Sequence, residues 1–246
     1  MKIAHLSDTH IGAGRDRLVE LNHLVAHICA THEPDDTAVA ITGDLVERPL
    51  EVLYSQLRRA LMPLVVAGFD LYCVPGNHDV HSLRGVDLGG RGDYAGWHRH
   101  VAPLIGGLAL AHGVREWRFG GHQVLGIDTN YASARDRDPD LARGCVGQAQ
   151  LGELTMVLEA GAIVLGHHRV WWDDYLHRLE DADRLHDVLD PRASFYLCGH
   201  QHEAHEVLKG AVRYVAAPRS TQRHEGKLRY QVLDLNGNAL RWVHVD

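Results

Sequence analysis

Five short clusters of metal-ligand residue types are spread along the chain. They are Asp8-Thr9-His10, Gly43-Asp44, Gly76-Asn77-His78-Asp79, Gly166-His167-His168 and Gly199-His200-Gln201-His202. Mixed imidazole and carboxylate ligands suit Mn, Fe, Zn or Co better than Ca or Mg. One aspartate can bridge two ions, and two ions about 3.5–4 Å apart can share a hydroxide and clamp a phosphoryl group. The clusters therefore predict a metal centre, and a pair of metals held by them could act on a phosphoryl group.

Each cluster directly follows a short apolar segment that has the pattern of a buried strand. Strands are expected over 2–6, 37–42, 71–74, 162–165 and 195–198, and helices over 18–30, 50–61, 148–159 and 179–189. This alternation predicts βαβ units and a largely parallel sheet. Parallel strands deliver their carboxyl ends to one edge of the sheet, where such folds keep their sites. The five clusters are therefore expected to converge.

The other segments suggest a more β-rich second half. A hairpin is expected over 114–119 and 123–127, a helix over 94–104, and loops over 83–93 and 135–144. Four more strands are expected over 206–208, 211–216, 228–235 and 240–245. Because no repeat or linker interrupts the pattern, a single domain over 1–246 is expected.

Composition narrows the class of protein. The 246 residues are 45% hydrophobic and 23% charged, as in ordinary globular proteins, and the net charge of -7 disfavours a large nucleic-acid surface. The four cysteines are well separated, which indicates reduced thiols. No apolar run is long enough for a signal peptide or a membrane helix. We expect a cytoplasmic monomer or homodimer with no membrane partner.

The ordered series DxH, GD, GNHD, GHH and GHxH resembles the calcineurin-like metallophosphoesterase superfamily over nearly the whole chain. Each motif alone is weak, but five in order are specific. The resemblance implies an α/β fold, a four-layer α/β/β/α sandwich of two mixed β-sheets flanked by helices. It also implies two metal ions, with Mn or Fe favoured. The first would be held by Asp8, His10, Asp44 and His202, and the second by the bridging Asp44 with Asn77, His167 and His200.

The resemblance extends to residues that would contact substrate. His78 matches the histidine that contacts the scissile phosphate, where it would stabilise charge or protonate the leaving oxygen. Residues 43–48 are similar to GDxxDR of the phosphoprotein-phosphatase branch, with Glu47 in place of Asp. Glu47 would then orient His78. Further substrate contacts are expected from Asn77, Arg48, His168 and Arg169.

Within the superfamily the chain looks most like class III cyclic-nucleotide phosphodiesterases. The similar parts are 7–10, 179–183, 197–202 and 217–221. That group usually has HHPP where this chain has His167-His168-Arg169-Val170, so one wall of the pocket differs. The resemblance implies a phosphodiesterase in which a metal-bridging hydroxide attacks a nucleotide-type diester and His78 assists the leaving group.

Three alternatives remain open. Arg169 and the arginine-rich loops would suit a DNA or RNA nuclease of the same superfamily. Glu47-Arg48 would suit a phosphomonoesterase or a protein phosphatase. A non-catalytic scaffold would be expected to lose ligands or the phosphate-facing histidine, whereas all are present in this chain.

Overall fold

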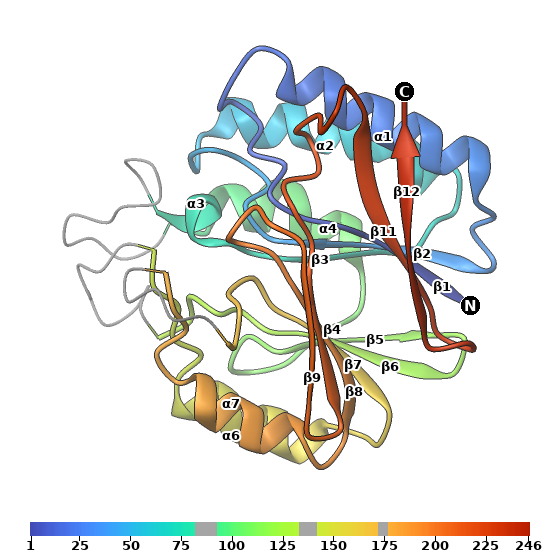
Figure 1. The fold of residues 1–246 in the computed structure, drawn as a ribbon. Helices are drawn as coiled ribbons and strands as arrows, with labels where there is room; N and C mark the ends of the chain where they lie inside the picture. Colours follow the sequence, from blue (N-terminus) through green and yellow to red (C-terminus); the bar gives the residue numbers. More distant parts are fainter. Residues whose placement is uncertain (82–92, 133–141, 172–176) are drawn as a thin grey trace.

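Two β-sheets pack face to face, and helices cover their outer sides (Figure 1). The computed structural model describes residues 1–81, 93–132, 142–171 and 177–246. This is the four-layer α/β/β/α sandwich that the resemblance implied, so that prediction is confirmed. The loops predicted over 83–93 and 135–144 lie mostly outside the described residues.

The first sheet has five strands in the order β12-β11-β1-β2-β3. Its members are β1 (Lys2–Leu6), β2 (Thr37–Thr42), β3 (Leu71–Val74), β11 (Leu228–Asp234) and β12 (Ala239–Val245). Strands β1, β2 and β3 are parallel, and β11 and β12 are antiparallel to their neighbours. Helices α1 (Arg17–Thr31) and α2 (Glu51–Val66) cover its outer face (Figure 1).

The second sheet has seven strands in the order β4-β5-β6-β7-β8-β10-β9. They are β4 (Leu108–Ala109), β5 (Arg115–Phe119), β6 (His122–Gly126), β7 (Ala162–Leu165), β8 (Ala193–Cys198), β9 (His205–Lys209) and β10 (Val212–Ala216). The central strands β6, β7, β8 and β10 are parallel. Helices α6 (Gln148–Val157) and α7 (Ala182–Leu189) lie on its outer face (Figure 1).

Alternate side chains of the central strands serve two cores. On β7, Ile163 and Leu165 join the apolar cluster that also contains the first sheet, whereas Val164 joins the cluster under α6 and α7. This is the expected result when successive side chains of a strand point to opposite faces and both faces are covered. The two cores fix the strand ends, and therefore the loops that carry the polar clusters.

Some local structure differs from the sequence-based prediction. The helix predicted over 50–61 continues to Val66 with Pro63 inside it. Leu61 and Leu64 are both buried, so tertiary packing outweighs the poor helix propensity of proline. The short helix α3 (Asn77–Val80) was not predicted, and the helix predicted over 94–104 contains the π-helical turn η1 (Trp97–Val101) followed by α4 (Ala102–Ile105). Among the described helices, none is long and apolar enough to cross a bilayer.

Candidate metal centre

The five polar clusters meet at the carboxyl ends of β1, β2, β3, β7 and β8. The backbone at this edge is unusual, because five candidate ligands have positive φ angles, between 44° and 74°. These residues are Asp8, His10, Asp44, His200 and His202. Only two other described non-glycine residues have positive φ. Such strained conformations persist where the surrounding structure enforces them, and they cluster at functional sites.

The first ligand group joins loops that follow β1, β2 and β8. Its members are Asp8, His10, Asp44 and His202. Nε2 of His10 lies 3.0 Å from Nε2 of His202 and 3.5 Å from Oδ2 of Asp44. Nε2 of His202 lies 3.3 Å from Oδ1 of Asp8. Two imidazole nitrogens and two carboxylate oxygens thus converge on one point, as a transition-metal site requires.

A second ligand group lies on the other side of Asp44. Nε2 of His167 is 3.4 Å from Oδ1 of Asp44 and 3.1 Å from Oδ1 of Asn77. Nδ1 of His200 is 3.1 Å from the same His167 nitrogen. Asp44 therefore turns one carboxylate oxygen toward each group, which is the geometry of a bridging ligand.

Hydrogen bonds outside the two groups leave the converging atoms available. Nδ1 of His10 lies 2.9 Å from Oε2 of Glu47, and Nδ1 of His167 lies 2.8 Å from the carbonyl oxygen of Thr42. Donation from Nδ1 places the lone pair of each ring on Nε2, and this arrangement is typical of metal-binding histidines. Oδ1 of Asp8 is buried, and among the described residues it accepts no well-formed hydrogen bond, although Nε2 of the candidate ligand His202 lies 3.3 Å away. A cation would satisfy it, so the residues present fit a metal.

The charges of the two groups are strongly coupled. Burial alone would lower the pKa of His167, but the Asp44 and Asp8 carboxylates raise it to about 9. Burial alone would raise the pKa of Asp44, but His167 and His78 hold it well below its usual range. In the absence of metal, a proton on His167 thus compensates the buried carboxylates. Metal binding has to displace that proton.

Comparison with known proteins decides the family. The sequence model for calcineurin-like phosphoesterases matches residues 1–204. This chain belongs to the calcineurin-like phosphoesterase family. The resemblance found in the sequence is therefore confirmed, and no curated protein sequence matches the chain.

Solved structures of similar fold include the phosphopantetheinyl hydrolase PptH from Mycobacterium tuberculosis, at 16% identity and a TM-score of 0.54 over 89% of this chain and 90% of that one. A putative 5'-nucleotidase from Staphylococcus aureus has 15% identity and a TM-score of 0.52, over 100% of this chain and 54% of that one. The sulfate thiohydrolase SoxB from Thermus thermophilus has 13% identity and a TM-score of 0.54, over 99% of this chain and 56% of that one. This chain spans about half the length of the last two. At these identities the likeness concerns the fold.

In this phosphoesterase, Glu47 supports the site differently from the sequence-based expectation. Its carboxylate bonds to His10, and lies 3.9 Å from Nδ1 of His78. Nδ1 of His78 is instead 3.1 Å from the backbone carbonyl oxygen of Glu47. The backbone N–H of His78 also donates to Oδ1 of Asp44. His78 is thus oriented by main-chain contacts, one of which engages its Nδ1.

The other expected substrate contacts have different surroundings. His168 is buried, and its Nδ1 and Nε2 lie 2.7 Å from the Thr129 hydroxyl and 3.1 Å from the Ala142 carbonyl oxygen. Arg169 is buried and donates to the carbonyl of Glu203. Both ring nitrogens of His168 and one terminal nitrogen of Arg169 are thus held by contacts inside the protein, and a substrate contact for either residue stays a prediction. Arg48 is exposed and forms no side-chain hydrogen bond or ion pair with a described residue.

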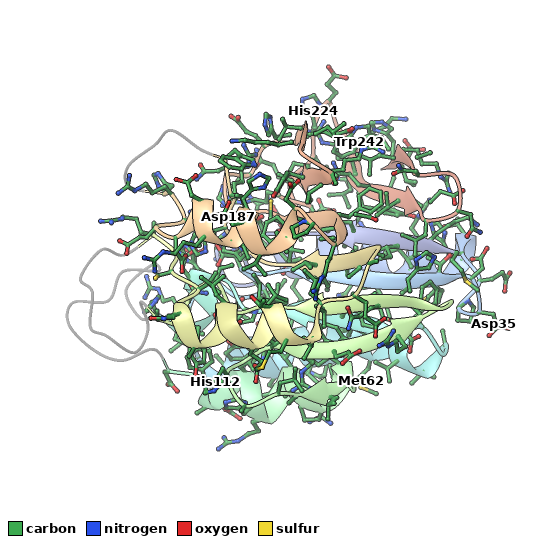
Figure 2. All side chains as sticks on the ribbon, turned by 90° about the horizontal axis from the view of Figure 1, so that it is seen from below. Asp35, Met62, His112, Asp187, His224 and Trp242 are labelled. Carbon is green, nitrogen blue, oxygen red and sulfur yellow. The ribbon has the colours of Figure 1, made fainter. Side chains whose placement is uncertain are left out.

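Two residues outside the predicted ligand set support the site, and the sequence already favoured a turn or supporting role over a ligand role for one of them, Asp79. The carboxylate of Asp79 accepts hydrogen bonds from the backbone N–H groups of Val46 and Gly76, at 3.0 and 2.8 Å. It therefore ties the Asp44 loop to the Asn77 loop. Arg219 places a terminal nitrogen 3.0 Å from Nε2 of His202. No spacing rule in the sequence pointed to either contact. Unlike the buried candidate ligands His10, His167 and His200, His224 is exposed on an outer turn (Figure 2).

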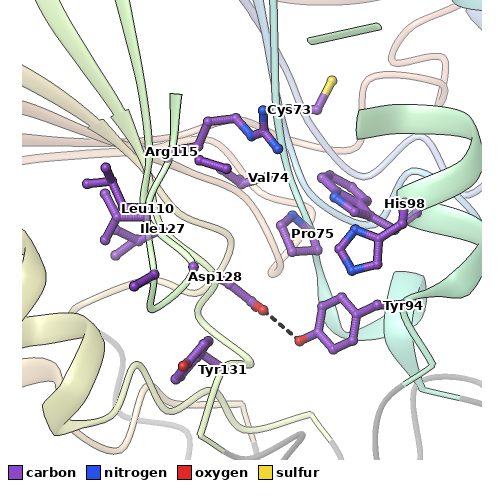
Figure 3. Close-up of a pocket in the computed structure, with 16 residues that line it drawn as sticks. Cys73, Val74, Pro75, Tyr94, His98, Leu110, Arg115, Ile127, Asp128 and Tyr131 are labelled. Carbon is purple, nitrogen blue, oxygen red and sulfur yellow. Dashed lines mark hydrogen bonds between the residues drawn. The ribbon is translucent and has the colours of Figure 1, made fainter. Parts of the chain in front are cut away.

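A separate cavity of about 290 Å³ lies between β3, the η1 segment and β4–β6. Figure 3 shows Tyr94 donating a hydrogen bond to Asp128 across it, and Pro75, His98 and Arg115 along its wall. None of the candidate metal ligands lines this cavity. The candidate metal ligands lie instead at the carboxyl ends of β1, β2, β3, β7 and β8.

Proposed function

We propose that this family member is a binuclear phosphodiesterase that acts on a nucleotide-type phosphodiester. The observation that carries the proposal is Asp44, whose two carboxylate oxygens face two separate ligand groups, at 3.5 Å from His10 and 3.4 Å from His167. A shared carboxylate is what a two-metal site needs to hold its ions close together. Manganese or iron are the favoured metals, because the ligands mix imidazole with oxygen donors.

The proposed ligand assignment follows the two groups. The first metal is assigned to Asp8, His10, Asp44 and His202, and the second to Asp44, Asn77, His167 and His200. When bound, two such metals supply Lewis acidity toward the phosphoryl oxygens and lower the pKa of water toward neutrality. Glu47 and the Thr42 carbonyl hold His10 and His167 in the tautomer that presents Nε2.

His78 is the proposed general acid. Its Nδ1–H donates to the Glu47 carbonyl, so Nε2 is the nitrogen that can hold a proton for the leaving oxygen. Its ring lies 4.7 Å from the ring of His10, at the edge of the first ligand group, and its side chain is 18% exposed. A substrate phosphate above the two groups would therefore be within its reach. Asn77 is assigned both to the second metal and to the phosphate.

The test is hydrolysis of bis-p-nitrophenyl phosphate by metal-stripped protein to which Mn²⁺ is added back. Activity is expected only with metal, and is expected to be lost in Asp44→Ala. Asp187→Ala is the matched control, because Asp187 is an exposed carboxylate on α7 (Figure 2). Inactivity of the wild-type protein with Mn²⁺, Fe²⁺, Zn²⁺ and Co²⁺ would contradict the proposal. Single-stranded DNA and p-nitrophenyl phosphate, run in parallel, test the nuclease and monoesterase alternatives.

The observations support the diesterase over those alternatives. The Glu47 carboxylate bonds to Nδ1 of His10 and lies 3.9 Å from Nδ1 of His78, so the side-chain hydrogen bond from Glu47 to His78 that suggested a protein phosphatase is not formed. The net charge of -7 counts against a large nucleic-acid surface. The complete ligand set counts against a non-catalytic scaffold.

A further inference from the structure

Arg219 lies directly against the first ligand group. One of its terminal nitrogens is 3.0 Å from Nε2 and 3.1 Å from Nδ1 of His202. The lone pairs of the two ring nitrogens diverge, so a donor equally close to both lies over the face of the ring. The guanidinium therefore covers His202 without blocking the direction in which Nε2 would bind a metal.

The loop that carries Arg219 is fastened to the metal-binding loops. Ser220 and Ser7 exchange two hydrogen bonds of 3.0 Å, and the Thr221 hydroxyl donates to the Thr9 carbonyl at 2.8 Å. Ser220 and Thr221 are fully buried. Arg219 thus projects from a fixed backbone, and little conformational entropy would be lost in using it for binding.

A second arginine approaches the same loop from the start of α1. Arg17 donates to the carbonyl of Thr221 at 2.6 Å. Burial lowers the pKa of Arg219, and the carboxylate of Asp8 opposes this while the nearby charge of Arg17 adds to it. Two guanidinium groups therefore share one side of the site.

Among the described residues, Arg17 and Arg219 form no ion pair, whereas the nearby Arg223 lies 2.8 Å from Glu20. Nε of Arg219 is buried and has no hydrogen-bond acceptor in the part of the chain that the structure describes. An unmet buried donor is costly, and a guanidinium fork is well suited to phosphate oxygens. This side of the site is thus built to receive an anion.

The scissile diester cannot account for both arginines. A phosphodiester carries a single negative charge, and in the proposed function two metal ions and His78 already face it. We propose that Arg219, assisted by Arg17, binds a second phosphate on the organic group of the substrate, beside His202. The substrate class is then a phosphodiester that also carries a phosphate monoester. The position of the scissile group in this inference rests on the proposed function.

The test compares two substrates that differ only in this second phosphate. They are the p-nitrophenyl ester of thymidine 5′-phosphate and the same compound with a 3′-phosphate. The wild-type protein with Mn²⁺ is expected to prefer the second by about tenfold in kcat/KM, mainly through KM, since a charged hydrogen bond contributes at least that much. In Arg219→Gln the ratio is expected to fall to near one. Arg219→Lys keeps the positive charge but loses the forked guanidinium group, and it is expected to retain part of the wild-type preference.

Arg223→Gln is the matched control, because Arg223 is close in sequence but paired with Glu20. It is expected to keep the wild-type ratio, and all variants are compared by thermal melting to exclude loss of fold. A wild-type ratio near one, or a ratio that persists in Arg219→Gln, would overturn the inference.

A binding measurement separates this inference from the proposed reaction. Calorimetry with the Mn²⁺-loaded protein is expected to show about tenfold tighter binding of thymidine 3′,5′-bisphosphate than of thymidine 5′-phosphate, lost in Arg219→Gln. If neither ester is hydrolysed but this difference is found, the proposed reaction fails and the anion site stands. Equal binding of the two nucleotides by the wild-type protein would overturn the anion site whatever the activity.

Discussion

Oε2 of Glu47 lies 2.9 Å from Nδ1 of His10, so the carboxylate fixes the tautomer of a candidate metal ligand. Replacing Glu47 with Gln is expected to weaken binding of the first metal. The neutral amide can turn its N–H₂ group toward the His10 ring, and it does not raise the basicity of the imidazole as the carboxylate does. Such changes typically cost about 10–100-fold in metal affinity. Titration of Mn²⁺ against a competing chelator measures the loss.

Glu51→Gln is the control for this change. Glu51 also contacts a histidine, His100, at 2.6 Å, but it lies at the exposed start of α2 and His100 is no candidate ligand. Its metal affinity is expected to match that of the wild type. Equal affinities for Glu47→Gln and the wild type would show that His10 needs no such support.

The two ligand groups predict different metal losses for single substitutions. His202 belongs only to the first group and His167 only to the second, whereas Asp44 faces both. Metal analysis is expected to give one tightly bound ion in His202→Ala and in His167→Ala, and fewer in Asp44→Ala. Electron paramagnetic resonance of the Mn²⁺ protein is expected to lose its spin-coupled signal in all three. Two ions retained in Asp44→Ala would argue against a shared carboxylate.

Close packing behind the first ligand group makes Gly199 sensitive to substitution. A β-carbon at Gly199 would overlap the Ser7 hydroxyl and the Asp8 carboxylate, which are both buried. Gly199→Ala is expected to destabilise the protein by about 1–3 kcal/mol, as overpacking does, and to displace Asp8. Urea unfolding measures the first effect and metal titration the second.

Gly152→Ala is the matched control, because no atom lies within 4 Å of the β-carbon it would add in α6. It is expected to stabilise the protein by about 0.5–1 kcal/mol through the better helix propensity of alanine. If the two substitutions changed stability alike, close packing at Gly199 would not be the cause.

Sequence reasoning worked best where a local pattern determines the structure. The strands before Asp8, Asp44 and His167 are short buried runs, and parallel strands must end at a common edge, so their convergence was predictable. The contacts that tune these residues depend on tertiary packing. Glu47 reaches His10 and Arg219 reaches His202 across separate loops, and neither pair has a recognisable spacing.

The sequence also did not reveal that two of the predicted substrate contacts are buried. His168 and Arg169 follow a candidate ligand, and that position suggested contact with substrate. In the fold, both side chains turn inward and bond to backbone or hydroxyl groups of neighbouring loops. The direction of a side chain after a strand end depends on the local φ and ψ angles, which a single sequence does not specify.

His5 is expected to make the stability of the protein depend on pH. It is fully buried on β1, and burial lowers its pKa from 6.5 to about 4. Between these values the unfolded chain binds a proton that the folded protein does not. Stability from this residue is therefore complete above about pH 6.5 and is lost as the pH falls toward 4. The loss between pH 7 and pH 5 is about 2 kcal/mol.

Urea unfolding of the metal-free protein at the two pH values tests this expectation. In His5→Gln, which can keep the hydrogen bond to Thr42 but does not titrate, the loss is expected to be smaller by that amount. His244→Gln, at an exposed position on β12, is expected to behave like the wild type. A pH dependence that is identical in His5→Gln and the wild type would contradict the assignment.

The contribution of His78 to kcat is expected to be larger for substrates with poorer leaving groups. With Nδ1 bonded to the Glu47 carbonyl, its Nε2 is positioned to deliver a proton to the leaving oxygen. Nitrophenolate departs readily without a proton, whereas phenolate needs one. His78→Ala is therefore expected to lower kcat for diphenyl phosphate by about 10²–10⁴-fold, and to lower it less for bis-p-nitrophenyl phosphate. His112→Ala, at an exposed position (Figure 2), is the control. If His78→Ala slowed both esters equally, His78 would stabilise phosphoryl charge rather than act as the proton donor.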